Sequence, residues 1–357
     1  MASIESTSIF SLSFSSDLRA LTNQQKSEII QSFWPLTSSS SIQYEDTTFM
    51  AFLQCFENEI FQIQHHHHQF AVNSLRGMMD LAHSLRNMTM SPLSHVLRDL
   101  SKQYLSVEES SIQRSVELLV RLWLTINVNS AAIAVGPTFP REIPLDWAHE
   151  LSLESLIQIH YPKPQTNQNL SARSKVDGRF TAAYLVDVCG MSLYWTNHLT
   201  DHLRIDPKQR VLTVYKHKSF LHSQIRATES CPIPRDVLSE ALDTLNLLFP
   251  FGDLPTKQLL ARENQRIFYG LGSYGRDRQQ DLGCYIHWRE ELQDLIDSFR
   301  QPPRTWKQLA TDRRNMMEWA MFWVTVMVGL LTFVSIPCNI IQAIYSVKGY
   351  RATAAQF

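Results

Sequence analysis

The stretch WAMFWVTVMVGLLTFVSI, residues 319–336, decides the class of this protein. It is predominantly apolar, and no Asp, Glu, Lys or Arg occurs anywhere between Trp319 and Val347. As a helix rising 1.5 Å per residue, such a stretch spans about 27 Å, close to the roughly 30 Å hydrocarbon layer of a bilayer. Buried helices of soluble proteins rarely run this long without a charge. The sequence therefore predicts one membrane-spanning helix within 319–347, with 319–336 as its core.

Aromatic side chains mark both ends of this segment. Trp319 and Trp323 lie near its start and Tyr345 near its end, where aromatic rings prefer the headgroup level. Pro337 leaves two possibilities open, because proline removes one backbone donor. Residues 338–347 either continue a kinked membrane helix or lie at the interface.

The cations on either side of the segment favour a cytosolic N-terminal side, since Lys and Arg concentrate in cytosolic flanks. Four precede the segment and two follow it: Arg304, Lys307, Arg313 and Arg314, then Lys348 and Arg351. Because only a short tail, 348–357, follows, we expect a tail-anchored, single-pass protein. The charge of that tail fits the endoplasmic reticulum or the mitochondrial outer membrane equally.

The composition indicates a helical chain without a general affinity for nucleic acid. The 33 Lys+Arg residues balance 34 Asp+Glu, for a formal net charge of -1, so no positive excess attracts phosphate backbones. Only 11 of 357 residues are glycine, which disfavours glycine-rich and turn-dense all-β folds. The 5 cysteines are far apart and form no C-x-x-C pair, so neither a disulfide framework nor a zinc knuckle is predicted.

We expect a mainly α fold with a small α+β unit. A polar stretch with two prolines separates a helical half from a half of mixed pattern. The predicted organisation is a disordered Ser-rich tail (1–20), an α-helical domain (21–160), a linker or long loop (161–179), an α+β unit plus helices (180–303), a basic juxtamembrane segment (304–318), the transmembrane segment (319–347) and the short C-terminal tail (348–357).

Periodic patterns predict five helices in the first half. Thr22 and Gln25 have the spacing of a capping box. Phe49, Phe52, Leu53, Phe56 and Ile60 recur on one face of a second helix. The other three are expected at 70–88, from Ser91-Pro92, and at 109–127.

The second half adds two short strands. MSLYWT (191–196) and RVLTVYK (210–216) are rich in β-branched, aromatic and aliphatic residues, which is typical of strands. NHLTDHL, residues 197–203, is predicted as a short helix between them. Longer helices are expected at 180–188, 237–249 and 284–299.

Two sequence elements carry a resemblance to other proteins. The first is W-T-x-x-L-x-x-H-L and the second is D-R-R-N, directly before the membrane segment. Here they are Trp195, Thr196, Leu199, His202 and Leu203, then Asp312, Arg313, Arg314 and Asn315. In these elements the C-terminal half resembles an uncharacterised fungal family with a single C-terminal transmembrane helix. The resemblance implies a fungal origin and a membrane anchor, but no activity, cofactor or catalytic residue.

His198 and His202 are the candidate metal ligands. On a helix, positions i and i+4 share one face, which is how metalloproteases hold zinc. The glutamate expected after the first histidine is absent, because Leu199 stands there. His217 or His222 would complete a site only if the fold brought them close. Structural histidines are therefore the favoured interpretation, and no bound metal is predicted.

Two other motifs have plain interpretations. The four consecutive histidines, residues 65–68, are interpreted as a polar loop between helices. GLGSYG, residues 270–275, matches G-x-G-x-x-G but lacks the strand and helix that a nucleotide site needs. No cofactor is predicted. Asn87 and Asn169 lie in glycosylation sequons, which matter only on a luminal side.

Three functions are compatible with these features. The leading hypothesis is a non-enzymatic, tail-anchored protein whose cytosolic region binds an unknown protein partner at a membrane surface. The alternative is a membrane-bound metal-dependent hydrolase using His198 and His202. The third is an oligomeric, channel-like protein. Ala320, Gly329 and Ser335 form no G-x-x-x-G, so the sequence leaves pairing of the membrane helix open.

Overall fold

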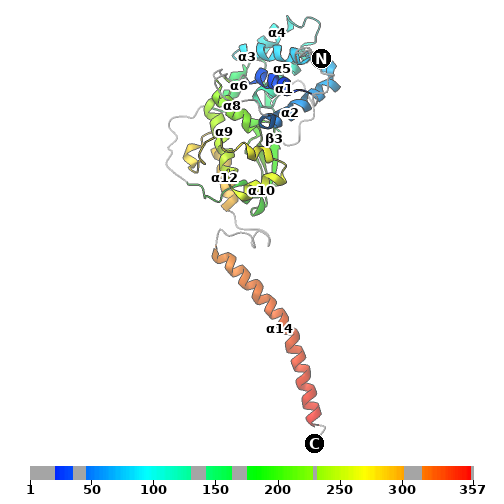
Figure 1. Ribbon diagram of the computed structural model, residues 1–357, viewed down its shortest axis with the longest axis vertical. Coiled ribbons are helices and arrows are strands. Elements are labelled where there is room, and N and C mark those ends of the chain that lie inside the picture. The colour runs from blue at the N-terminus through cyan, green and yellow to red at the C-terminus, as the bar shows by residue number, and fades with distance from the viewer. Residues whose placement is uncertain are drawn as a thin grey trace, which may run out of the picture.

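The computed structural model of the protein describes residues 21–34, 46–129, 142–162, 175–227, 231–300 and 316–354. They form a mostly helical body with two small sheets, and one long helix that lies apart from it (Figure 1). The predicted mostly helical class, with small sheets and one C-terminal apolar helix, is confirmed.

The body begins with helices. Up to residue 160 they are α1 (Asn23–Phe33), α2 (Asp46–His65), the 3-10 turn η3 (His67–Gln69), α3 (Leu75–Asn87), α4 (Leu93–Ser101), α5 (Glu109–Leu124) and α6 (Leu153–His160). After residue 160 the helices of the body are α7 (Ala182–Asp187), η4 (Leu199–Asp201), α8 (Lys218–Arg226), α9 (Arg235–Leu248), α10 (Leu254–Arg262), α11 (Arg266–Gly270), η5 (Leu282–Cys284) and α12 (Arg289–Arg300). The long helix apart from the body is α14 (Met316–Ala354).

The start of α1 and the buried face of α2 are as the sequence predicts. The Gln25 N–H donates to Thr22 Oγ1, and the Thr22 N–H donates to the Gln25 side chain at 2.9 Å, which completes the capping box. On α2 the apolar face is buried at Phe49, Phe52, Phe56 and Ile60, with Leu53 partly buried.

α5 is the central helix of the first half. Its buried residues face every side and include the polar Ser115 and Glu117, as expected for a helix surrounded by neighbours. It packs against α3 and α4. The ring N–H of Trp34 donates to the Trp123 carbonyl at 2.8 Å, which holds the end of α1 against α5.

Within the described residues, five strands form two sheets, and the sequence predicts the two longest of these strands. In the three-stranded sheet the order is β3 (Ser192–Thr196), β5 (Val211–Tyr215), β4 (Ile205–Asp206). β3 and β5 are parallel, whereas β4 is antiparallel to β5. The smaller sheet pairs β1 (Val128–Asn129) with β2 (Leu145–Asp146), again in parallel. Strands of two residues carry too little periodicity to be predicted.

A single hydrophobic core runs from Ile29 to Phe299, through both predicted units. The Thr125 hydroxyl lies 2.6 Å from the Tyr215 hydroxyl, and the Leu199 N–H donates to the Thr125 carbonyl at 2.7 Å. Residues 21–160 and 180–300 therefore share one core. Of the predicted linker, 163–174 lie outside the described residues, but Val176 is buried.

GLGSYG (270–275) forms turns at the end of α11, without a preceding strand, so it has no phosphate-cradle geometry. Helix α12 begins later than the predicted residue 284. The reason is Glu240, whose Oε1 accepts the N–H groups of His287 at 2.7 Å and Trp288 at 2.8 Å, which holds that segment outside the helix.

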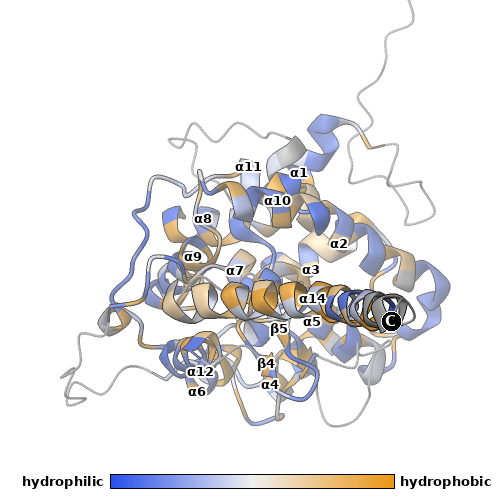
Figure 2. Ribbon diagram, turned by 90° about the horizontal axis from the view of Figure 1, so that it is seen from below, coloured by the Kyte–Doolittle hydropathy of each residue, from blue (hydrophilic) through white to orange (hydrophobic). Residues whose placement is uncertain are grey.

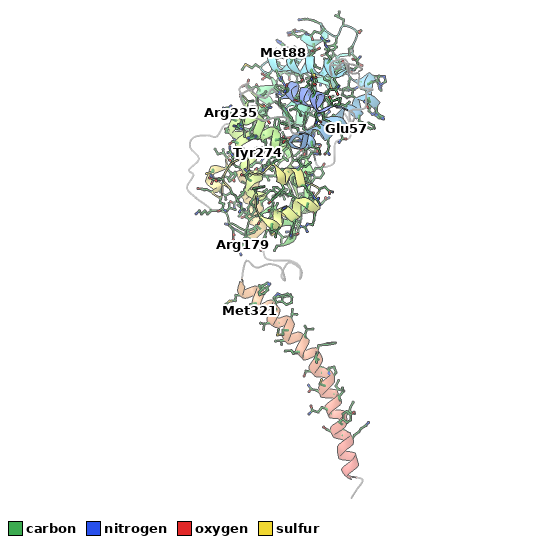
Figure 3. All side chains as sticks on the ribbon, viewed as in Figure 1. Glu57, Met88, Arg179, Arg235, Tyr274 and Met321 are labelled. Atoms are coloured by element: carbon green, nitrogen blue, oxygen red, sulfur yellow. The ribbon has the colours of Figure 1, made fainter. Side chains whose placement is uncertain are left out.

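Helix α14 contains the predicted membrane segment and continues unbroken through Pro337. Residues 338–347 therefore continue the helix. The candidate span Trp319–Lys348 contains an 18-residue window with a mean hydropathy of 2.1, and no residue of that window is buried. Hydrophobic residues predominate along it (Figure 2), and its side chains, from Met321 onward, meet no other element (Figure 3). It is long and apolar enough to cross a membrane.

Candidate functional site

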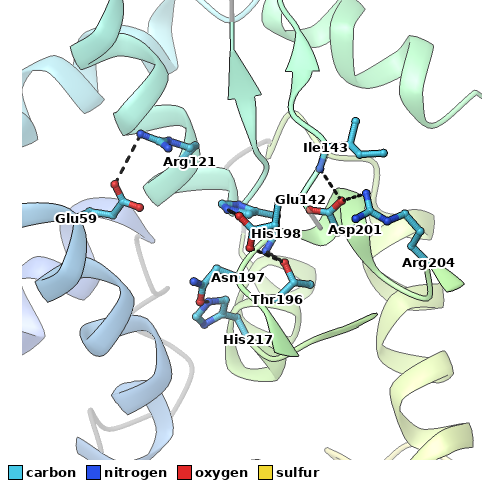
Figure 4. Close-up of polar contacts among 10 residues, drawn as sticks. All are labelled: Glu59, Arg121, Glu142, Ile143, Thr196, Asn197, His198, Asp201, Arg204 and His217. Atoms are coloured by element: carbon cyan, nitrogen blue, oxygen red, sulfur yellow. Dashed lines mark hydrogen bonds and ion pairs between the residues drawn. The ribbon is translucent and has the colours of Figure 1, made fainter. Parts of the chain in front are cut away.

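Polar side chains gather where strands β3 and β5 end (Figure 4). Because the strands are parallel, their carboxyl ends lie at one edge, which is where parallel sheets commonly form ligand sites. Asn197 and His198 follow β3, and Lys216 and His217 follow β5. Glu142, from the segment before β2, reaches the same edge. We call Glu142, Thr196, Asn197, His198, Lys216 and His217 the edge cluster.

A carboxylate–imidazole pair lies at the centre of the edge cluster. His198 Nε2 lies 3.3 Å from Glu142 Oε2, and the two side chains are only 10% and 6% exposed. Thr196 Oγ1 donates to the other Glu142 oxygen at 3.4 Å and accepts the His198 N–H at 3.0 Å. The buried His198 Nδ1 has no hydrogen-bond partner in the described part of the chain. A ring held through one nitrogen in this way can accept a proton at the other.

His217 supplies a second imidazole. Its Nε2 lies 3.0 Å from Asn197 Oδ1, and its Nδ1 is buried without a partner among the described residues. Burial lowers the pKa of His217 well below its usual value, and the nearby Lys216 and His198 add to the shift. His217 is therefore a neutral imidazole at pH 7.

Asp201 holds the segment that carries Glu142. Its Oδ1 accepts the Ile143 N–H at 3.2 Å and Arg204 Nη1 at 2.8 Å (Figure 4). Burial raises the pKa of Asp201, against the opposing effect of these two donors. The contact fixes the approach of Glu142 to His198.

His202 belongs to the core and not to the edge cluster. Its Nδ1 accepts the Tyr215 N–H at 3.3 Å, and its Nε2 lies 2.7 Å from Thr244 Oγ1. Because the Thr244 hydroxyl donates to the Ala241 carbonyl, the ring is neutral with its proton on Nε2. Burial lowers the pKa of His202 to about 3. Both nitrogens are thus occupied by protein partners.

The structure does not bring His198 and His202 together as metal ligands. They flank η4, a 3-10 turn, and do not share the face of an α-helix as the spacing argument assumed. His222 stacks on Tyr274 with ring centroids 3.9 Å apart. Within the described residues, no group of three or more His, Cys, Asp or Glu is placed to hold a metal ion.

The remaining predicted positions fall in three places. The membrane-anchor residues all lie on α14: Trp319, Trp323, Gly329, Pro337 and Tyr345. The juxtamembrane residues lie outside the described residues: Asp312, Arg313, Arg314 and Asn315. The histidines 65–68 are exposed at the end of α2 and in η3, as predicted for a polar connection.

Sequence reasoning missed most of the edge cluster. A signal existed for the residues after β3 and β5, because polar side chains directly after parallel strands meet at one edge. No signal marked Glu142, which is distant in sequence and precedes a two-residue strand. In the W-T-x-x-L-x-x-H-L element, Leu199, His202 and Leu203 belong to the core, and Thr196 reaches Glu142.

Comparison with protein families, curated proteins and solved structures finds no match to this chain. The resemblance to a fungal family therefore stays a prediction, and any function rests on the geometry described above.

Proposed function

We propose that α14 anchors the protein in a membrane as a single span and that the body is presented for binding to another protein. One observation supports the anchor above all: the 30-residue span Trp319–Lys348 of α14 contains an 18-residue window with a mean hydropathy of 2.1, and no residue of that window is buried. In water, an exposed apolar surface of this size is unfavourable, whereas the hydrocarbon layer of a bilayer covers most of it.

Flotation on a density gradient tests the anchor. Each Arg at the centre of a membrane helix costs about 2.5–3.5 kcal/mol, so Leu331→Arg with Val334→Arg should cost about 6 kcal/mol and release the chain from membranes. The matched control makes the same two changes at exposed apolar residues of the body, Leu105 and Ile159, which are 89% and 65% exposed. Recovery of the wild-type chain in the soluble fraction would refute the anchor.

We propose that the body faces the cytosol, because more cations precede the span than follow it. The glycosylation sequon at Asn87 lies at the end of α3, so a glycan there would show on which side of the membrane the body lies. In intact cells, Asn87 should remain without a glycan, and protease added to sealed microsomes should digest the body. Glycan at Asn87 would place the body on the luminal side.

An exposed apolar patch on the body supports an interaction role. Phe251 and Leu254 lie three residues apart and are 61% and 63% exposed. Phe251 packs on Tyr269 with ring centroids 5.2 Å apart, and Lys257 Nζ lies 6.0 Å from the centre of the same ring. Exposed aromatic residues are enriched at protein-binding surfaces.

Proximity labelling from the body tests the interaction role. Phe251→Ser with Leu254→Ser should remove specific neighbours while the protein stays on the membrane. Leu105→Ser, at another exposed leucine, is the control and should leave the labelled set unchanged. An unchanged set in the double variant would rule out this patch as the docking surface.

The edge cluster favours one second candidate, an acid–base enzyme. The Glu142–His198 pair leaves Nδ1 of His198 without a partner among the described residues, as a general base requires. This candidate retains His198 from the hydrolase hypothesis. It does not retain the metal ion, because both ring nitrogens of His202 are already hydrogen-bonded to protein groups. If the purified chain turns over a substrate in a hydrolase screen, His198→Gln should abolish turnover and His83→Gln should not. Equal turnover in His198→Gln would exclude the role.

A further inference from the structure

The polar side chains of the membrane segment all lie on one side of α14. Between Trp319 and Val347, Ser, Thr, Asn and Gln occur only at Thr325, Thr332, Ser335, Asn339, Gln342 and Ser346. The first step, from Thr325 to Thr332, is a whole heptad, and the steps after it alternate between three and four residues. At about 100° per residue, all six fall within an arc of about 100°. We call this set the polar seam.

The hydroxyls of the seam are largely satisfied within the helix itself. Thr325 and Thr332 donate to the carbonyls of Met321 and Val328, each at 2.8 Å. Ser346 donates to the Gln342 carbonyl at 2.9 Å. These groups can therefore face hydrocarbon at little cost.

The two amides of the seam are not satisfied in this way. Asn339 Nδ2 donates to Ser335 Oγ at 3.2 Å, but an amide has two donors and two acceptor sites. The Gln342 side chain makes no hydrogen bond within residues 316–354. In a bilayer core no water compensates such groups, so each favours a polar partner on a neighbouring helix.

The spacing of the seam matches two helices packed side by side. Residues that repeat every 3.5 positions stay at the contact line of a left-handed helix pair, and this repeat describes all six seam residues. Val328 occupies the remaining contact position. Pro337 lies on the opposite face at about 100° per residue, so neither its ring nor its missing N–H disturbs the contact line.

We propose that α14 pairs in the membrane with a second copy of itself, in parallel, through the polar seam. The two amides indicate which helix packs against the polar seam. In a parallel two-fold pair each residue faces its own copy, and an amide is self-complementary, because it donates and accepts at once. Asn339 then bonds Asn339 of the second copy, and Gln342 bonds Gln342. The pairing rests on the proposed membrane anchor.

Energy transfer between labelled full-length chains in phosphatidylcholine vesicles tests the pairing. The variant exchanges residues across the helix: Asn339→Ile with Ile341→Asn, and Gln342→Ile with Ile344→Gln. It has the same composition as the natural chain, so its membrane insertion should be unchanged. Each amide moved off the seam should weaken association about 3-fold to 30-fold.

The outcomes separate the pairing from the anchor. Transfer that persists on dilution with lipid in the natural chain, and falls in the exchange variant, supports the pairing. If natural chains float with the vesicles but show no more energy transfer than randomly distributed chains, the pairing proposal is overturned and the anchor proposal stands. The partner of the polar seam is then a different membrane helix. Equal transfer in the exchange variant also overturns it, because another face then makes the contact. Chains that do not float overturn both proposals.

Discussion

Acidification should destabilise the body through His202, because the core is built around the neutral form of this ring. Nδ1 accepts the Tyr215 N–H, so a proton added there would place two donors against each other. Burial accordingly lowers the pKa of His202 to about 3, whereas the unfolded chain has a pKa of about 6.5.

The direction of the pH effect on stability follows from these two pKa values of His202. Since the folded pKa is the lower one, the unfolded chain takes up the proton first as the pH falls. The stabilisation is complete above about pH 6.5 and is lost as the pH falls from about 6.5 to about 3. At 1.36 kcal/mol for each pH unit, the loss is about 2 kcal/mol at pH 5 and about 4 kcal/mol at pH 3, where the folded ring is itself half protonated.

Denaturant titration of the full chain in detergent, followed by tryptophan fluorescence at pH 7 and pH 5, measures this loss. His202→Gln keeps an acceptor and a donor but does not titrate, so its stability should fall about 2 kcal/mol less between the two pH values than that of the natural chain. His83→Gln, at an exposed position of α3, is the control and should behave as the natural chain. Equal acid sensitivity in His202→Gln and the natural chain would refute the argument.

Three further predictions concern stability and can be measured by the same titration at pH 7. Glu240→Ala leaves the buried N–H of Trp288 and the N–H of His287 without their acceptor and should cost about 2–3 kcal/mol, while Glu240→Gln, which keeps an acceptor oxygen, should cost less; equal losses would contradict this role. Thr22→Ala should cost about 1 kcal/mol by removing the cap of α1, and Thr22→Ser should be nearly neutral; a neutral Thr22→Ala would mean that the cap contributes nothing. Arg276→Lys should cost about 1 kcal/mol, because lysine cannot donate to both Asp243 oxygens as the guanidinium does at 2.7 and 2.6 Å. An unchanged midpoint of the denaturant titration would show that this two-bond pair does not stabilise the fold.

Local signals in the sequence predict much of the helical framework. Thr22 and Gln25 predict the start of α1, and the aromatic periodicity from Phe49 to Phe56 predicts the buried face of α2. The strands β3 and β5 are long enough for their composition to be recognised. In each case the residues that define the element are close together in the chain, so one short window contains the information.

Other features depend on contacts between distant residues. Helix α8 reads as polar, yet its Lys218 is buried, with Nζ donating to the Gly272 carbonyl and lying 5.3 Å from the centre of the Phe268 ring. Burial lowers the pKa of Lys218 to about 8. Glu142 reaches His198 from a remote segment in the same way. No local pattern in the sequence indicates such contacts, so the pairing of Glu142 with His198 can be recognised only in the folded chain.

The length of α14 has a consequence for where the protein can reside. Its apolar window of 30 residues is about 45 Å long, which exceeds a typical hydrocarbon layer by about 15 Å. Absorbing the whole excess by tilt would require about 48°, beyond the usual limit of about 40°. Hydrophobic mismatch therefore remains, and it is smaller in a thick, sterol-rich bilayer than in a thin one. As the proposed membrane anchor, α14 should therefore sort the protein towards the thickest membrane it can reach.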